Sequence, residues 1–173
     1  MHETITVREG GKDLTFSFAG INDFHGGGFP GGVAHGLKAM QAAFPLLSDT
    51  APERREIGVV TAFGGPGGRD AIEMVTRALT DGRLVVDKGI GGKDVISEPP
   101  GPYVWRFSYR GRTVEVRIRP GHVREEFVAL GAKPDRTAAE DERLEWLKSE
   151  MAERLLALPA ADIYEASVRP AAS

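Results

Sequence analysis

The residues of this chain that could carry chemistry gather around two glycine-rich segments. The first reads GINDFHGGGFPGG over residues 20–32 and contains His25, with Asp23 two residues before it. The second is GGPGG at residues 64–68, between an apolar run and an expected helix, with Asp70 shortly after it. Imidazole and carboxylate groups transfer protons, and N–H groups at the start of a helix favour anions. Each segment is therefore a candidate for such chemistry.

If the two segments share one site, two interpretations of that site are open. In the first, a pocket between the segments binds a small organic or anionic ligand, and its expected binding residues are Asp23, Gly26, Gly27, Gly28, Phe29, Gly64, Gly65, Gly67 and Gly68. In the second, the chain is an enzyme in which His25 is the general acid or base and Asp23 or Asp70 orients it. The N–H groups of Gly64–Gly68 would then stabilise developing negative charge. The enzyme requires a carboxylate within hydrogen-bond distance of His25, whereas a binding module does not.

Three familiar glycine motifs do not fit. HGGGF at residues 25–29 is typical of esterase oxyanion holes, but the chain lacks the GxSxG sequence that holds the nucleophile. No Lys-Ser or Lys-Thr follows GGPGG, so it is not a Walker nucleotide loop, and its glycine spacing fails the dinucleotide fingerprint. A tight connection between a strand and a helix explains GGPGG as well as anion binding does.

Composition excludes several classes of protein. The 173 residues include no cysteine, which excludes disulfides, thiolate metal sites and a thiol nucleophile. The net charge of −3 argues against a nucleic-acid-binding protein, and no apolar run is long enough to span a bilayer. The N-terminus does not resemble a signal peptide, so a cytoplasmic location is expected.

A metal site would depend on few histidines. The four are His2, His25, His35 and His122, and a metal held by them without cysteine is the interpretation ranked last. For His35 and His122 alone, surface or supporting positions are expected.

Hydrophobic periodicity predicts the elements that position these residues. The expected strands cover residues 4–9, 14–18, 57–63, 83–87, 103–109 and 112–119. The expected helices run from the first glycine segment to about Phe44, over residues 69–80, and for about 20 residues after the capping-box sequence at residues 137–140. Residues 20–32 are expected to be a loop, and about the last 12 residues a tail. Because strands and helices do not alternate regularly, the fold class is α+β.

Arginines concentrate in the hairpin of residues 103–119 and just after it, at Arg106, Arg110, Arg112, Arg117, Arg119 and Arg124. A solvated strand face balanced by the acidic C-terminal helix is the preferred explanation. Recognition of a carboxylate or phosphate partner is the alternative.

Two motifs together resemble the FmdE-like family, which takes its name from a component of formylmethanofuran dehydrogenase. FHGGGFPGGVAHGLKAM, from Phe24, is similar to that family's opening FHGHxCPG and apolar helix, and GGPGGRDAIEMVTRALTDGRLVVDKG is similar to its second motif. The resemblance covers roughly residues 15–125. It implies an α+β fold with a mixed sheet and helices on one side, here extended by the C-terminal amphipathic helix. The expected division is a domain at residues 1–135 and a helix with a tail at residues 136–173.

The chain departs from the family pattern at its metal-binding or thiol positions. Gly27 replaces a histidine, and Phe29 and Gly67 replace the two cysteines, while His25 and Asp70 match. The family-type metal is therefore not expected, and no cofactor is identified. The resemblance implies a small soluble homodimer with a remodelled, more apolar pocket, acting alone or as an accessory subunit of a larger enzyme.

Overall fold

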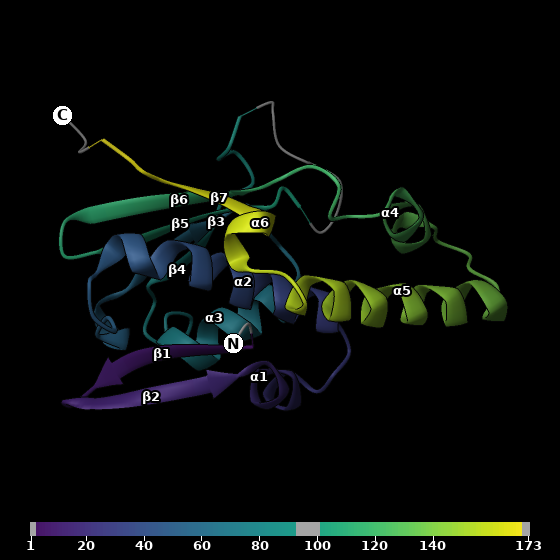
Figure 1. Cartoon of the computed structure of the whole chain (residues 1–173). Helices are drawn as coiled ribbons and strands as arrows, with labels where there is room; N and C mark the ends of the chain where they lie inside the picture. The colour runs from purple at the N-terminus through teal and green to yellow at the C-terminus, as the bar shows by residue number, and fades with distance from the viewer. Residues whose placement is uncertain (1–2, 93–100, 171–173) are drawn as a thin grey trace.

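The computed structural model describes residues 3–92 and 101–170, which form a helical layer between a five-stranded sheet and a two-stranded hairpin (Figure 1). The strands are β1 (Thr4–Glu9), β2 (Lys12–Ser17), β3 (Gly58–Thr61), β4 (Leu84–Val86), β5 (Val104–Tyr109), β6 (Arg112–Ile118) and β7 (Tyr164–Val168). The helices are α1 (Phe18–His25), α2 (Pro30–Leu47), the 3-10 turn η1 (Arg54–Glu56), α3 (Pro66–Thr76), α4 (Glu125–Ala132), α5 (Ala138–Leu156) and α6 (Ala160–Ile163).

The larger sheet has the order β4-β3-β5-β6-β7, with β3 and β4 parallel and the other pairs antiparallel. Its apolar face carries alternate residues such as Trp105, Phe107, Val114 and Val116, all fully buried, and helix α2 packs against it. The opposite face carries polar residues such as Arg106. The expected α+β class, with a mixed sheet and helices on one side, is confirmed.

Helix α2 is the centre of the molecule, with 12 of its 18 residues buried. It contacts α3, α5 and strands β5, β6 and β7, and the hairpin lies on its other side (Figure 1). The sequence predicts an end near Phe44 because Pro45 follows, but the helix continues to Leu47. Pro45 is exposed and lies in the last turn, where its missing N–H removes a single bond, and Ser48 N still donates to Phe44 O at 3.1 Å.

The expected loop at residues 20–32 is wrong over most of its length, because helix α1 covers Phe18–His25 and helix α2 begins at Pro30. Ser17 Oγ caps it by accepting from Gly20 N at 3.0 Å, and Ile21 is fully buried beneath it. Gly26, at φ 91°, ends it by donating to the carbonyls of Asn22 and Asp23. The Gly, Asn and Asp residues of this segment have weak helix propensity, so packing and capping decide its structure.

Helix α3 begins at Pro66, three residues before the expected start. The last glycines of GGPGG therefore lie inside the first helical turn. The helix ends at Thr76 rather than Thr80, since Arg77 adopts a left-handed conformation at φ 59°.

The C-terminal helix is confirmed together with its capping box, in which Thr137 Oγ1 accepts from Glu140 N at 3.2 Å and Glu140 Oε1 accepts from Thr137 N at 3.1 Å. The expected tail is wrong, because β7 pairs antiparallel with β6 at the edge of the larger sheet. Ile163 and Tyr164 are buried there and fix the strand, a tertiary effect with little local pattern to predict it.

Candidate functional site

The two glycine segments meet where helices α2 and α3 begin, and their backbones touch. A Cβ atom built on Gly67 would lie 2.5 Å from Phe29 O and 2.7 Å from Val33 N. One built on Gly32 would lie 3.3 Å from Gly67 Cα, and one on Gly36 only 2.8 Å from Ala71 Cβ. These glycines let α2 and α3 cross with no side chains between them. The close approach that the glycines permit is therefore between the two helices and not between the protein and a ligand.

Beside this contact lies a cavity of about 350 Å³. Its walls come from the starts of α2 and α3, the segment before α3, and helices α4 and α5. The lining residues are Phe29, Gly31, Gly32, Phe63, Gly65, Pro66, Gly67, Phe127, Gly131, Arg136, Leu144 and Lys148. Three phenylalanines and a leucine make most of this surface apolar.

Three of the expected binding residues, Phe29, Gly65 and Gly67, line the cavity. Phe29 adds an aromatic ring to its wall, in line with the more apolar pocket that the family resemblance implies. The remaining expected residues do not line it: they are Asp23, Gly26, Gly27, Gly28, Gly64 and Gly68. Asp23 is exposed on α1, and Gly68 is buried with its Cβ direction blocked by the Phe63 ring at 2.6 Å.

Both helices reach the cavity with uncapped N-termini. The N-cap residues Phe29 and Gly65 make no side-chain capping bond, and prolines occupy the first helical positions. In the described part of the chain, the backbone N–H groups of Gly31, Gly32 and Gly67 have no hydrogen-bond partner. Such N–H groups, together with the helix dipoles, favour negative charge at this end of the cavity.

Two cationic side chains also line the cavity, each with a carboxylate partner. Lys148 Nζ lies 4.4 Å from the centre of the Phe29 ring and 2.8 Å from Glu145 Oε1. Arg136 donates from Nε to Asp141 Oδ1 at 2.7 Å.

His25 and Asp70 are brought together as a pair, with 2.7 Å between His25 Nδ1 and Asp70 Oδ2. The other ring nitrogen, Nε2, accepts from the backbone N–H of Phe29 at 3.0 Å. Since Nε2 accepts, Nδ1 carries the proton and donates it to Asp70. The side chain of His25 is only 5% exposed.

This pair links three helices: α1 through its last residue, His25, α3 through Asp70 in its second turn, and α2 through its N-cap, Phe29. A carboxylate is thus within reach of His25, as the enzyme interpretation requires. Both ring nitrogens are nevertheless occupied by protein groups, and neither His25 nor Asp70 lines the cavity. The arrangement positions Phe29, which does line it.

The other histidines lie elsewhere. His35 is buried, with Nδ1 2.8 Å from Tyr164 Oη and Nε2 3.2 Å from Met151 Sδ, so a surface position is wrong for it. Burial lowers the pKa of His35 to about 3. His122 Nε2 is 2.9 Å from Asp162 O. Within residues 3–92 and 101–170, no three histidine or carboxylate side chains are grouped so as to hold a metal ion.

The hairpin arginines are paired, but among the six only Arg124 pairs with the acidic C-terminal helix, so the expected balance by that helix is wrong for the arginines of the strands. Arg110 binds Glu56, Arg124 binds Glu150, and Arg112 and Arg119 donate to backbone carbonyls. A denser group surrounds the buried carboxylate of Glu115, which accepts from Arg106, Arg117 and Arg169 at 2.6–2.7 Å.

Nine of the twelve lining residues were not among the expected binding residues: Gly31, Gly32 and Pro66, which belong to the two glycine segments, and Phe63, Phe127, Gly131, Arg136, Leu144 and Lys148, which do not. Leu144 lies on the apolar stripe that predicts α5, but nothing local places that stripe against the glycine segments. The cavity wall contains residues from both of the expected parts of the chain, 1–135 and 136–173. Helices α4 and α5 lie beside the starts of α2 and α3 there.

A scan against protein-family models finds no match, and a search of curated proteins finds no relative. The resemblance to the FmdE-like family therefore stays a prediction. Among the described helices, none is both long and apolar enough to cross a membrane.

Proposed function

We propose that this protein binds a small organic molecule with an apolar body and one anionic group in the cavity at the starts of α2 and α3. The cavity itself carries the proposal. Its volume of about 350 Å³ falls in the range of small-molecule sites, roughly 300–1,000 Å³. Its phenylalanine and leucine walls favour an apolar or aromatic body.

The polar groups supply the preference for an anion. The free N–H groups of Gly31, Gly32 and Gly67 lie at one end, and Lys148 and Arg136 contribute positive charge. Because both cations already have carboxylate partners, the N–H groups are the stronger anion donors in this proposal. The anionic group of the ligand is accordingly placed at the glycine end and its body toward Phe127 and Leu144.

Binding is better supported than catalysis by His25. A general base needs a free lone pair directed at the substrate, and the Nε2 lone pair of His25 accepts from Phe29 N. The same cavity is compatible with a stand-alone binding protein and with an accessory subunit that holds a ligand for a larger enzyme. A homodimer belongs to the proposal only through the family resemblance.

The test uses two fluorescent probes, the sulfonate 1-anilinonaphthalene-8-sulfonate and the neutral N-phenyl-1-naphthylamine. We expect saturable binding of both, with the sulfonate favoured. Gly131 lines the cavity, and a Cβ there would meet nothing within 4 Å. Gly131→Trp should therefore fill the space and weaken both probes by about tenfold or more. Ala132→Trp, at the next, exposed position of α4 and outside the cavity, is the matched control.

A second variant separates charge from shape. Lys148→Gln should weaken the sulfonate about threefold and leave the neutral probe unchanged. Equal loss of both probes would contradict the anionic preference. Binding that Gly131→Trp leaves unchanged, in a variant that melts as the parent does, would overturn the proposed site.

A further inference from the structure

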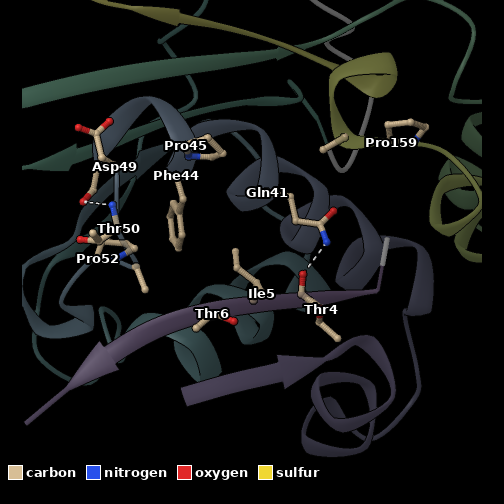
Figure 2. Close-up of a pocket in the computed structure, with 13 residues that line it drawn as sticks. Thr4, Ile5, Thr6, Gln41, Phe44, Pro45, Asp49, Thr50, Pro52 and Pro159 are labelled. Atoms are coloured by element: carbon tan, nitrogen blue, oxygen red, sulfur yellow. Dashed lines mark hydrogen bonds between the residues drawn. The ribbon is translucent and has the colours of Figure 1, made fainter. Parts of the chain in front are cut away.

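A second hollow lies on the other side of α2, away from the cavity. It is an open groove of about 520 Å³ between β1 and the C-terminal half of α2. Figure 2 shows β1 along its lower side, with Ile5 and Phe44 facing each other between the strand and the helix. Its other walls are residues 48–52, which follow α2, and residues 159–160.

One edge of β1 is open in this groove. Strand β1 pairs with β2 in the register Ile5↔Phe16 and Val7↔Leu14, and in antiparallel pairs alternate residues direct their backbone groups to opposite edges. Arg8 N donates to Pro52 O at 2.9 Å, so the backbone groups of Arg8, Thr6 and Thr4 face away from β2.

These groups are only partly used. Gln41 Nε2 donates to Thr4 O at 2.7 Å, as the dashed line in Figure 2 marks. In the described part of the chain, the N–H and C=O of Thr6 have no partner. Unpaired strand edges accept further strands.

The chain itself shows how this edge is extended. Arg8 and Glu53 form a single parallel bridge, so the backbone at Pro52 and Glu53 already lies against β1 as a third strand would. Only that position of the edge is covered. The segment before Pro52 forms the wall of the groove and leaves Thr6 open.

The side chains of the groove define the chemistry of an occupant. Its floor is apolar at Ile5 and Phe44, and Pro52 and Pro159 stand in its walls. Asp49 is the one charged residue that lines it, and the exposed carboxylate has no ion-pair partner among the described residues. An apolar floor with a single negative charge at the rim fits a segment that carries an apolar residue and a basic one.

We propose that the groove binds an extended, basic segment of a partner protein, which adds to β1 as a strand. Its backbone pairs with the N–H and C=O of Thr6, one apolar side chain lies over Ile5 and Phe44, and a lysine or arginine faces Asp49. A second copy of this chain fits less well. Its own β1 edge is flanked by the same acidic residue, Asp49, so it lacks the charge complementarity that a basic segment has.

The experiment selects ligands and then removes the open edge. A phage-displayed library of linear eight-residue peptides is panned on the intact protein, and affinities of enriched peptides are measured by fluorescence anisotropy. Thr6→Pro removes the N–H that faces the groove, a change that edge strands tolerate. The matched control is Thr15→Pro. Thr15 is the cross-strand partner of Thr6, their hydroxyls are 2.8 Å apart, and its N–H faces the outer edge of β2.

We expect enriched peptides that contain an apolar residue and a lysine or arginine. Thr6→Pro should weaken them about tenfold or more, while Thr15→Pro, which loses the same hydroxyl contact, leaves them unchanged. Asp49→Lys should weaken binding more strongly at low salt than at high salt. This second variant decides the question if Thr6→Pro does not fold.

Three results would overturn the proposal. The first is a failure to enrich any peptide, and the second is peptide binding that neither Thr6→Pro nor Asp49→Lys reduces. The third is a homodimer that Thr6→Pro converts to a monomer and that no peptide displaces, since the occupant would then be a second copy. None of these results depends on the cavity at the other side of α2.

Discussion

Two regions at the start of α2 are both rich in glycine and lie next to a histidine, yet they use these residues differently. The helix junction, defined as Gly32, Gly36, Gly67 and Gly68, is packed so tightly that an added Cβ at Gly67 would overlap backbone atoms. The α1–α2 loop, Gly26–Gly28, is exposed, and Cβ atoms there would meet at most one atom within 4 Å.

The contrast separates two reasons for a glycine. In the junction the missing side chain matters, because two backbones approach each other. In the loop the dihedral angle matters, since Gly26 and Gly27 adopt φ values of 91° and 78°. The histidines differ in parallel. His35 is held in the core below the junction, whereas His25 ties the loop to Asp70. Four predictions test this difference.

The largest effect is expected at Gly67. Gly67→Ala places a methyl group 2.5 Å from Phe29 O, so α2 and α3 must move apart, at a cost of about 3 kcal/mol or more. Urea unfolding followed by circular dichroism measures the loss. A loss below about 1 kcal/mol would show that the helices separate easily and would weaken the distinction between the regions.

Acid should destabilise the core through His35. Burial holds its pKa at about 3 in the folded protein against about 6.5 when unfolded, so the unfolded chain binds the extra proton between these values. Stability is therefore full above about pH 6.5 and falls as the pH drops, by about 2 kcal/mol from pH 7 to pH 5. His35→Gln should flatten this dependence, and His122→Gln should reduce it only slightly, because the charge of His122 lowers the pKa of His35 less than burial does. An unchanged slope in His35→Gln would contradict the assignment.

An intermediate effect is expected at His25. His25→Ala leaves Asp70 and Phe29 N without their partner, which should cost about 1–2 kcal/mol of unfolding free energy. Because Phe29 lines the cavity, probe binding should weaken as well. His25→Asn tests geometry, since it restores at most one of the two bonds. Full probe affinity in His25→Ala would show that the ring does not position Phe29.

The smallest effects are expected in the loop itself. Gly26→Ala should cost about 1 kcal/mol, because an alanine must adopt the left-handed conformation that ends α1. Gly28→Ala, with no positive φ and open space around it, should change stability by less than about 0.5 kcal/mol. Equal losses at the two positions would contradict the assignment of the Gly26 effect to its backbone conformation.

Much of the fold could be predicted from local pattern. The hairpin of β5 and β6 follows from alternation around Arg110-Gly111, and α5 from its capping box and apolar stripe. Helix α1 and strand β7 could not be predicted in this way. In α1, residues of weak helix propensity form a helix that is anchored by one buried side chain, Ile21. In β7, pairing with β6 supplies what the sequence pattern lacks.

The site was predictable in part. The family resemblance, and not the spacing of residue types, led us to expect His25 near Asp70 and the two glycine segments in one site. Which of these residues face a cavity depends on where α4 and α5 lie, and no local motif encodes Phe127 or Lys148 as wall residues. The sequence also could not show that Phe29 N uses the second nitrogen of His25.

The bond between His35 and Tyr164 joins positions separated by 129 residues. During synthesis, α2 leaves the ribosome long before β7 is made. His35 and the apolar surface of α2 therefore stay exposed to solvent until β7 can pack on them. A core closed this late has many contacts between distant segments, which slows folding and exposes the nascent chain to aggregation. The native state therefore forms only after β7, which ends at Val168, has left the ribosome. Synthesis of the two glycine segments is not enough.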